Sequence, residues 1–199
     1  MSTGLFLGVR SSFTEDSQAS AWRFVDAINE SLSAFRLGPY QDPDSSPDGY
    51  VNVFFGRSSL DHHSSRVFEK IGKLATGRRE SPNLALIRDN PFRVAFVPFY
   101  FSGSIVTSYE EMLAGGRVRI SVGSLPNLLK ELALLASDLE IPMEGDQLAN
   151  ETAEHINNWT PFKGDDSIEL IENQRTAWLA LYEGTRLGIH HNIALSLAG

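Results

Sequence analysis

The sequence predicts an α+β fold, a single domain in which a mixed β-sheet of about five strands carries amphipathic helices. Three observations support this class. Runs of β-branched and aromatic residues interrupt segments of helical periodicity, no stretch repeats, and 42% hydrophobic residues over 199 positions suffice for one core. The expected order is β-α-β-α-β-β-α-α-α-β, with one domain spanning 1–199. An α/β fold of three layers is the alternative.

In the N-terminal part, each expected strand precedes a helix. Residues 5–9 alternate in hydrophobicity, which is typical of a strand with one buried face. The first helix ends at Gly38-Pro39, and its apolar positions recur at helical spacing: Trp22, Val25, Ile28, Leu32 and Phe35. A second strand is expected over 50–55 and a second helix over 60–76.

The middle of the chain predicts two strands and a helix. Residues 93–101 are almost continuously apolar, as expected of a central strand, with a bulge or an end at Pro98. Residues 117–122 alternate, so three side chains are expected to face the core: Val118, Ile120 and Val122. Ser124 and Pro126 then introduce a helix with a broad stripe of leucines.

The C-terminal part predicts two helices and a closing strand. A weaker helix is expected over 147–159, a long one over 167–190 and the strand over 193–197. Gly184 and Gly188 lie four residues apart inside the long helix. Because an internal glycine costs a helix about 1 kcal/mol, close packing against another element is the favoured explanation, and a hinge is the alternative.

The composition excludes several kinds of chemistry. The chain contains no cysteine, so disulfides, thiolate metal sites and cysteine nucleophiles are ruled out. No signal-peptide pattern opens the sequence, and no apolar run approaches the roughly 18 residues that a membrane span needs. We therefore expect a cytoplasmic protein without a membrane partner.

Charge is distributed very unevenly along the chain. Residues 138–172 contain ten acids and one base, a net charge of −9, whereas the whole chain carries −8. The segment also holds apolar side chains and lies between two expected helices, which is unlike a disordered acidic tail. We expect 138–172 to be a mostly helical, acidic surface of the domain.

This acidic surface suggests a non-enzymatic protein-binding module whose partner is a basic protein. An inhibitor, an immunity-like protein or a regulatory subunit would each fit, and self-association into a homo-oligomer is a further alternative. The candidate partner-binding residues are acids of the segment: Glu144, Asp146, Glu151, Glu154, Asp165 and Asp166.

The alternative function is a small metal-dependent or acid-base hydrolase of phosphoesters. Its catalytic candidates are Asp61, His62 and His63, since carboxylate and imidazole groups in series can hold a metal and activate water. No histidine precedes His62, and the favoured explanation of the tripeptide is that Asp61 caps the following helix, with both histidines in its exposed first turn. His190 and His191 suit the negative end of the long helix. The sequence therefore indicates no cofactor and no metal site, and favours a protein that is not an enzyme.

A basic stretch covers residues 66–93, with seven bases against three acids. Together with Arg117 and Arg119 it could contact phosphate or RNA, or it could pair with the acidic segment of the same molecule. The net charge of −8 makes nucleic acid an unlikely principal ligand.

Overall fold

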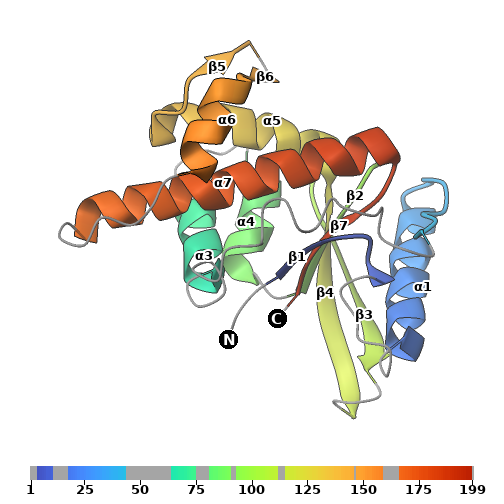
Figure 1. Ribbon diagram of the computed structural model, residues 1–199. Helices are drawn as coiled ribbons and strands as arrows, with labels where there is room; N and C mark the ends of the chain where they lie inside the picture. Colours follow the sequence, from blue (N-terminus) through green and yellow to red (C-terminus); the bar gives the residue numbers. More distant parts are fainter. Residues whose placement is uncertain are drawn as a thin grey trace.

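The computed structural model has a mixed five-stranded β-sheet at its centre (Figure 1). It describes residues 4–10, 18–43, 64–74, 81–90, 93–111, 115–145, 147–158 and 166–198. The strand order is β1-β7-β2-β4-β3, in which β2 and β4 are parallel and the other neighbours are antiparallel. The strands are β1 (Gly4–Leu7), β2 (Arg93–Val97), β3 (Ile105–Glu111), β4 (Gly116–Ser124) and β7 (Leu195–Ala198). The predicted α+β class is confirmed.

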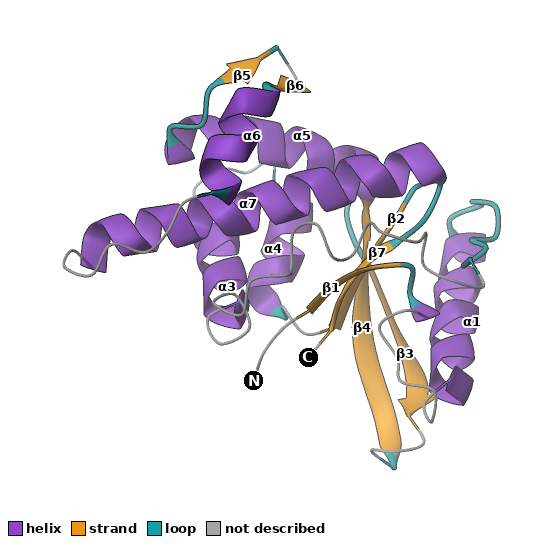
Figure 2. Ribbon diagram, in the orientation of Figure 1, coloured by secondary structure: helices purple, strands orange, loops and turns teal. Residues whose placement is uncertain are grey.

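Helices pack on both faces of this sheet (Figure 2). They are α1 (Gln18–Ala34), α3 (Ser64–Leu74), α4 (Pro82–Asp89), α5 (Leu125–Ala136), α6 (Asn150–Asn157) and α7 (Asp166–His191), with a 3₁₀ turn η4 (Ser137–Leu139). A two-stranded hairpin, β5 (Met143–Glu144) and β6 (Gln147–Leu148), precedes α6. Figure 2 shows this hairpin and α6 on the side of α5 and α7 away from the sheet.

The alternation of side chains in β2 divides the core into two halves. Val94 and Phe96 belong to the cluster built with α4, α5 and α7, while Ala95 and Val97 belong to the cluster built with α1. All four are fully buried, as expected of a central strand covered on both faces. The strand ends at Val97, directly before Pro98, which could not donate a ladder hydrogen bond.

Helices α5 and α7 run antiparallel and are joined along a continuous seam. Close to one end, a Cβ on Gly188 would lie 2.7 Å from a methyl group of Leu125. Further along, the indole Nε1 of Trp178 donates a 2.8 Å hydrogen bond to the carbonyl oxygen of Leu132. At the other end, Nε of Arg175 donates to the carbonyl oxygen of Leu139 at 2.8 Å. Gly188 therefore serves close packing, and the hinge explanation is not needed.

A polar network ties the chain after α1 to the sheet. The buried hydroxyl of Tyr40 donates to a carboxylate oxygen of Asp42 and accepts a 3.0 Å bond from the backbone N–H of Ala194. Asp42 also accepts from the backbone N–H groups of Val9 and Arg10, at 2.8 and 2.7 Å. Burial, and then the negative charge of Asp42, raises the pKa of Tyr40 far above its ordinary value.

Several expected elements differ from those observed. Helix α4, strand β3 and the β5–β6 hairpin were not predicted. Helix α4 and the hairpin strands are short, and the polar residues at the end of β3 obscure its alternation. Trp22 and Phe35 were expected on the buried face of α1, but they are 47% and 51% exposed. Trp22 follows the buried Ala21, but its ring lies outside the core with the guanidinium of Arg10 4.0 Å from its centroid, and Phe35 comes just after the last residue of α1. The strand expected over 50–55 lies outside the described residues.

Candidate acidic interaction surface

The β5–β6 hairpin presents one polar face and one apolar face. Glu144 pairs with Gln147 in the antiparallel register, and both are exposed. Met143 pairs with Leu148, and both pack against the main core. Gly145 follows β5 with φ +65°, a left-handed conformation that a two-residue hairpin turn requires and that glycine adopts without strain. The turn therefore fixes Glu144 on the outside.

Helix α6 continues this arrangement with two further exposed acids. Glu151 and Glu154 are three positions apart, so they lie on the same face, with Cβ atoms roughly 5–6 Å apart. Ile156 is 3% exposed and belongs to the core cluster, and Ala153 packs against that cluster. Apolar residues thus hold one side of the helix against the domain while its carboxylates project into solvent.

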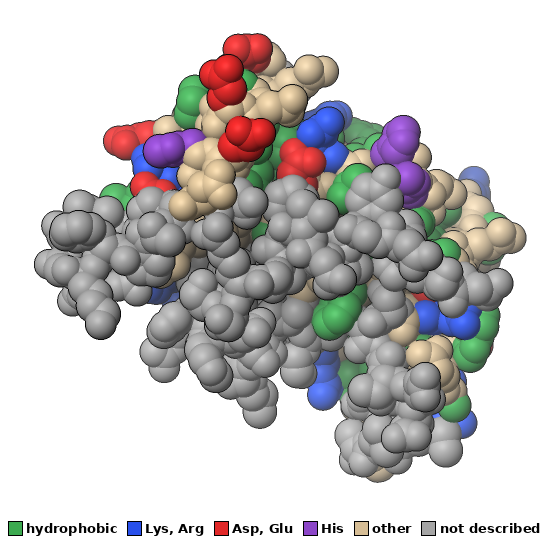
Figure 3. All heavy atoms as spheres, viewed as in Figure 1, with side chains coloured by type: hydrophobic (Ala, Val, Ile, Leu, Met, Phe, Trp, Pro, Cys, Tyr) green, Lys and Arg blue, Asp and Glu red, His purple; other side chains and the backbone are tan. Residues whose placement is uncertain are grey.

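The acids of the η4 turn extend the same surface toward α7. Asp138 and Glu140 are exposed, and Glu140 has φ 55°, which ends the turn in the left-handed conformation. Leu139 and Ile141, their neighbours in the chain, are 3% and 4% exposed. We define the acidic surface as Asp138, Glu140, Glu144, Glu151 and Glu154. Figure 3 shows carboxylates gathered over the part of the molecule where Figure 1 draws β5, β6 and α6.

Arg175 of α7 neutralises the edge of this surface. Its Nη1 lies 2.5 Å from Oε1 of Glu172, and its Nη2 lies 3.2 Å from Oε2 of Glu140. Glu172 is well shielded, with 13% of its side chain exposed, whereas Glu140 is 86% exposed. Arg175 therefore holds Glu172 inside the domain and pairs only loosely with Glu140.

Three carboxylates of the acidic surface carry negative charge that no described base offsets. Within the described ranges, Glu144, Glu151 and Glu154 form no ion pair. Within the described part of 66–93, Lys73 pairs with its neighbour Glu69 and Arg88 with its neighbour Asp89. Negative potential consequently projects outward from α6 and the hairpin.

The structure places the predicted partner-binding residues as follows. Glu144, Glu151 and Glu154 lie on the acidic surface, whereas Asp146 and Asp165 lie outside the described residues. Asp166 is the first residue of α7. Asp138 and Glu140 were not among the residues predicted from the sequence to bind a partner. Both flank the apolar Leu139, and a pattern of one apolar residue between two acids indicates a turn at the surface.

The catalytic candidates Asp61, His62 and His63 lie outside the described residues. Of the other histidines, His155 is exposed on α6, and His190 and His191 are close together at the end of α7, with ring centroids 4.7 Å apart. Over the described ranges, no group of three or more His, Asp or Glu residues is arranged to hold a metal ion. Nor is any described helix long and apolar enough to cross a membrane.

Comparison with known proteins gives one match. A family model described as "Putative DNA-mimic protein" matches residues 61–197, which is more than two thirds of the chain and includes the whole acidic surface. Neither the curated proteins nor the solved structures gave a match.

This match contradicts the function predicted from the sequence. The prediction was a module for a basic partner of unspecified kind, such as an inhibitor, an immunity-like protein or a regulatory subunit. The alternative was a phosphoesterase acting through Asp61, His62 and His63. The family description specifies mimicry of DNA, which is narrower than binding to any basic protein and differs from hydrolysis. Charge alone revealed an acidic surface, but it carried no information on the kind of molecule that the surface resembles.

Proposed function

The chain belongs to the family described as "Putative DNA-mimic protein", and on that premise we propose that its acidic surface occupies the DNA-binding site of a DNA-binding protein. Carboxylates would stand in that site where phosphates otherwise lie. The observation that carries this proposal is the set of exposed acids Glu144, Glu151 and Glu154, anchored on packed elements and without a described basic partner.

The spacing of charges on α6 supports the comparison with DNA. Each strand of duplex DNA carries one phosphate per roughly 3.4 Å of helix axis. Three residues of an α-helix advance roughly 4.5 Å, so Glu151 and Glu154 repeat negative charge along an axis on the same scale of a few ångströms. The Lys and Arg side chains of a DNA-binding site are flexible enough to follow a difference of that size.

Rigid attachment matters for such a mimic. A disordered acidic segment would lose conformational entropy when it docked, which would weaken binding. Here Leu148 and Ile156 are 8% and 3% exposed and belong to the main core, so the hairpin and α6 are already held in place. The carboxylates are therefore presented before the partner arrives.

The remaining predicted contacts fit the same proposal. Asp146, Asp165 and Asp166 belong to the same acidic stretch of sequence, and we retain them as partner contacts. The partner would be basic, as any protein that binds DNA through phosphates is. We also retain the expected cytoplasmic localisation. Self-association into a homo-oligomer remains a further prediction, which light scattering over a range of concentrations would detect.

The proposal is tested by competition with DNA. Three purified probes are suitable: a helix-turn-helix repressor, a minor-groove protein of the HU type and a homeodomain, each bound to a fluorescent duplex. We expect the protein to displace the duplex from at least one probe, which lowers the fluorescence anisotropy. The triple variant Glu144→Gln, Glu151→Gln, Glu154→Gln should lose most of this activity.

A matched control separates the site from net charge. The triple variant Asp26→Asn, Glu30→Gln, Glu110→Gln removes three exposed acids from α1 and β3, which Figure 1 draws well apart from β5, β6 and α6. Both triple variants change the net charge from −8 to −5. If the control loses as much activity as the acidic-surface variant, or if the wild-type protein displaces no duplex, the proposal is wrong.

A further inference from the structure

We propose that two arginines of the β3–β4 ribbon, Arg117 and Arg119, bind the acidic surface of a second copy of this chain, so that copies associate head to tail. The inference uses the charges that the structure exposes and does not depend on the proposed function. It specifies which two surfaces meet when the protein associates with itself.

The β3–β4 ribbon extends beyond the rest of the sheet. Strand β4 pairs with β2 at positions 121–124, whereas its pairing with β3 covers positions 116–122. Among the described strands, residues 116–120 therefore have a neighbour on one side alone. Figure 1 shows this part of β3 and β4 reaching away from α5, α6 and α7.

One face of the ribbon is buried, and the other carries the arginines. Val118 and Tyr109 belong to the core cluster built with α1. Because side chains alternate along a strand, Arg117 and Arg119 point to the opposite face, and both are exposed. Val106 of β3 lies on that face too and is 57% exposed. We call this exposed side of the ribbon the arginine face.

The positive charge of the arginine face is not offset locally. Within the described ranges, neither Arg117 nor Arg119 forms an ion pair. Glu110 lies opposite Arg117 in the register, and its backbone carbonyl accepts a 3.4 Å hydrogen bond from Nη1 of Arg23. Three guanidinium groups thus lie around one carboxylate at this end of the ribbon.

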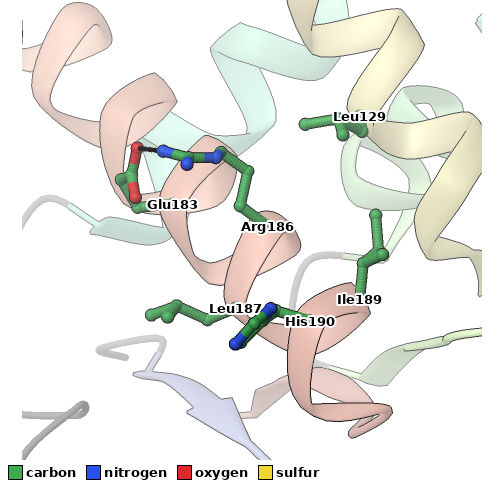
Figure 4. Close-up of a pocket in the computed structure, with 6 residues that line it drawn as sticks. All are labelled: Leu129, Glu183, Arg186, Leu187, Ile189 and His190. Atoms are coloured by element: carbon green, nitrogen blue, oxygen red, sulfur yellow. Dashed lines mark hydrogen bonds and ion pairs between the residues drawn. The ribbon is translucent and has the colours of Figure 1, made fainter. Parts of the chain in front are cut away.

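Several other bases are already paired with an acid of their own helix. These pairs are Lys73 with Glu69, Arg88 with Asp89, Arg175 with Glu172 and Arg186 with Glu183. Figure 4 shows the last of them beside a recess between α5 and α7, with Nη1 of Arg186 2.9 Å from Oε1 of Glu183. A carboxylate of another molecule would have to displace the existing partner there, whereas on the arginine face it would not.

The acidic surface has the complementary charge at a similar spacing. Glu151 and Glu154 have Cβ atoms roughly 5–6 Å apart on α6. Arg117 and Arg119, two positions apart on a strand, are separated by roughly 7 Å. A guanidinium group binds a carboxylate through two parallel hydrogen bonds, and the long arginine side chain can follow a difference of that size. The acidic surface of one copy therefore matches the arginine face of another.

The charge distribution favours a second copy over nucleic acid as the occupant. Residues 138–172 carry −9 of a total charge of −8, so every copy presents a strongly acidic part and a remainder of +1. A nucleic acid is negative along its whole length and would be repelled by the acidic part. A second copy repels at a distance as well, but this repulsion is screened beyond about 8 Å at 0.15 M salt, while pairs in contact are screened less.

The positions of the two surfaces determine the kind of assembly. Figure 1 draws the end of the ribbon and the β5–β6 hairpin at opposite ends of the molecule. The contact therefore joins two different surfaces, and each copy that binds leaves one surface free for the next copy. Association of this kind grows with concentration instead of stopping at a symmetric dimer.

Sedimentation velocity of the full chain over a range of concentrations tests the proposal. At about 0.15 M salt the average mass of the wild type should rise with concentration, and at about 0.5 M salt it should return to that of the monomer. The acid variant is Glu151→Gln with Glu154→Gln, and the arginine variant is Arg117→Gln with Arg119→Gln. Each alone should need at least about ten-fold more protein to associate. Mixed together, the two variants should form a dimer that grows no further, because each retains the surface that the other has lost.

Matched controls change the same charges elsewhere. Asp26→Asn with Glu30→Gln removes two exposed acids from α1, and Arg36→Gln with Lys70→Gln removes two exposed bases. Both controls should associate as the wild type does. Thermal unfolding shows whether each variant is folded. If the arginine variant is not, Arg119→Gln alone takes its place.

The outcomes separate this inference from the proposed function, because no DNA-binding protein takes part. A wild type that stays monomeric at every concentration overturns the inference and leaves the proposed function intact. The inference also fails if the controls lose association equally, or if the mixed variants form no dimer. Binding of a fluorescent duplex that is lost in the arginine variant, without self-association, would identify nucleic acid as the occupant instead.

Discussion

The carboxylate of Glu131 in α5 accepts a 2.8 Å hydrogen bond from the backbone N–H of Leu84 at the start of α4. It also accepts from the backbone N–H and the side-chain Nδ2 of Asn83, at 3.1 and 2.6 Å. Ser81, at the cap position of α4, makes no capping hydrogen bond with its side chain. A residue distant in sequence thus accepts hydrogen bonds from the free backbone N–H groups at the start of α4. Oδ1 of Asn83 in turn accepts a hydrogen bond from the backbone N–H of Ser124.

We expect Glu131→Ala to lower the free energy of unfolding by about 2–4 kcal/mol, because buried donors at the start of α4 would lose their acceptor. Urea unfolding measures the change. Glu30→Ala, which removes an exposed acid of α1, is the control and should change stability by less than about 0.5 kcal/mol. Equal stability of the two variants would show that α4 does not depend on this carboxylate.

The same carboxylate should make stability depend on pH. Burial raises the pKa of Glu131, and its hydrogen bonds oppose this shift without cancelling it. The folded state then retains a proton that the unfolded state has lost, so this contribution is greatest below about pH 4 and declines as pH rises through the folded pKa. The stability advantage of the wild type over Glu131→Gln should therefore shrink from pH 4 to pH 7. An advantage that grows instead would mean that the hydrogen bonds outweigh burial.

Gly123 of β4 should not tolerate alanine. A Cβ there would lie 2.5 Å from the ring of Phe96 and 2.6 Å from Oδ1 of Asn83. Both neighbours are fully buried and cannot move aside cheaply. We expect Gly123→Ala to cost about 2–3 kcal/mol in thermal or chemical unfolding. Gly38→Ala, where a Cβ meets nothing within 4 Å, should be neutral or slightly stabilising.

Replacing Arg175 should destabilise the fold more than replacing Arg186. Arg175→Met would leave the shielded carboxylate of Glu172 and the carbonyl of Leu139 without their donor, at a cost of about 1–3 kcal/mol. Arg186 is 51% exposed, so loss of its pair with Glu183 should cost less than about 1 kcal/mol. Arg175→Lys should recover only part of the loss, because an ammonium group lacks the planar fork. Chemical unfolding of the three variants provides the comparison.

Salt should favour the protein over DNA in competition for a probe. A protein with six to ten phosphate contacts loses roughly 10³–10⁵ in DNA affinity between 50 and 200 mM salt, because counterions are released from the duplex. The acidic surface offers a few separate carboxylates and condenses fewer counterions. Its affinity should therefore fall by a smaller factor, and displacement should need less protein at 200 mM salt than at 50 mM. Anisotropy titrations at the two salt concentrations measure this, and the opposite trend would contradict it.

Much of the fold could be predicted from the sequence because the longer elements have clear periods. The stripe of leucines predicted α5, and Ser124 with Pro126 predicted where it starts. The alternation around Ile120 predicted β4. Strand β3, helix α4 and the β5–β6 hairpin were missed. Their residues fit several conformations, and pairing with distant strands or helices decides among them. The role of Glu131 at the start of α4 could not be predicted from the sequence for the same reason, because no local pattern links Glu131 to Asn83.

The sequence by itself determined the charge of this protein: it concentrated acids in 138–172 and placed apolar residues among them. Only the tertiary structure decided which acids face solvent and which are neutralised. Glu172 turns toward Arg175, Glu131 is buried at the start of α4, and Glu144 and Glu154 project outward. The physical reason is that a carboxylate's contribution depends on its distance from other charges and on its hydration. Both are set by packing between segments far apart in the chain.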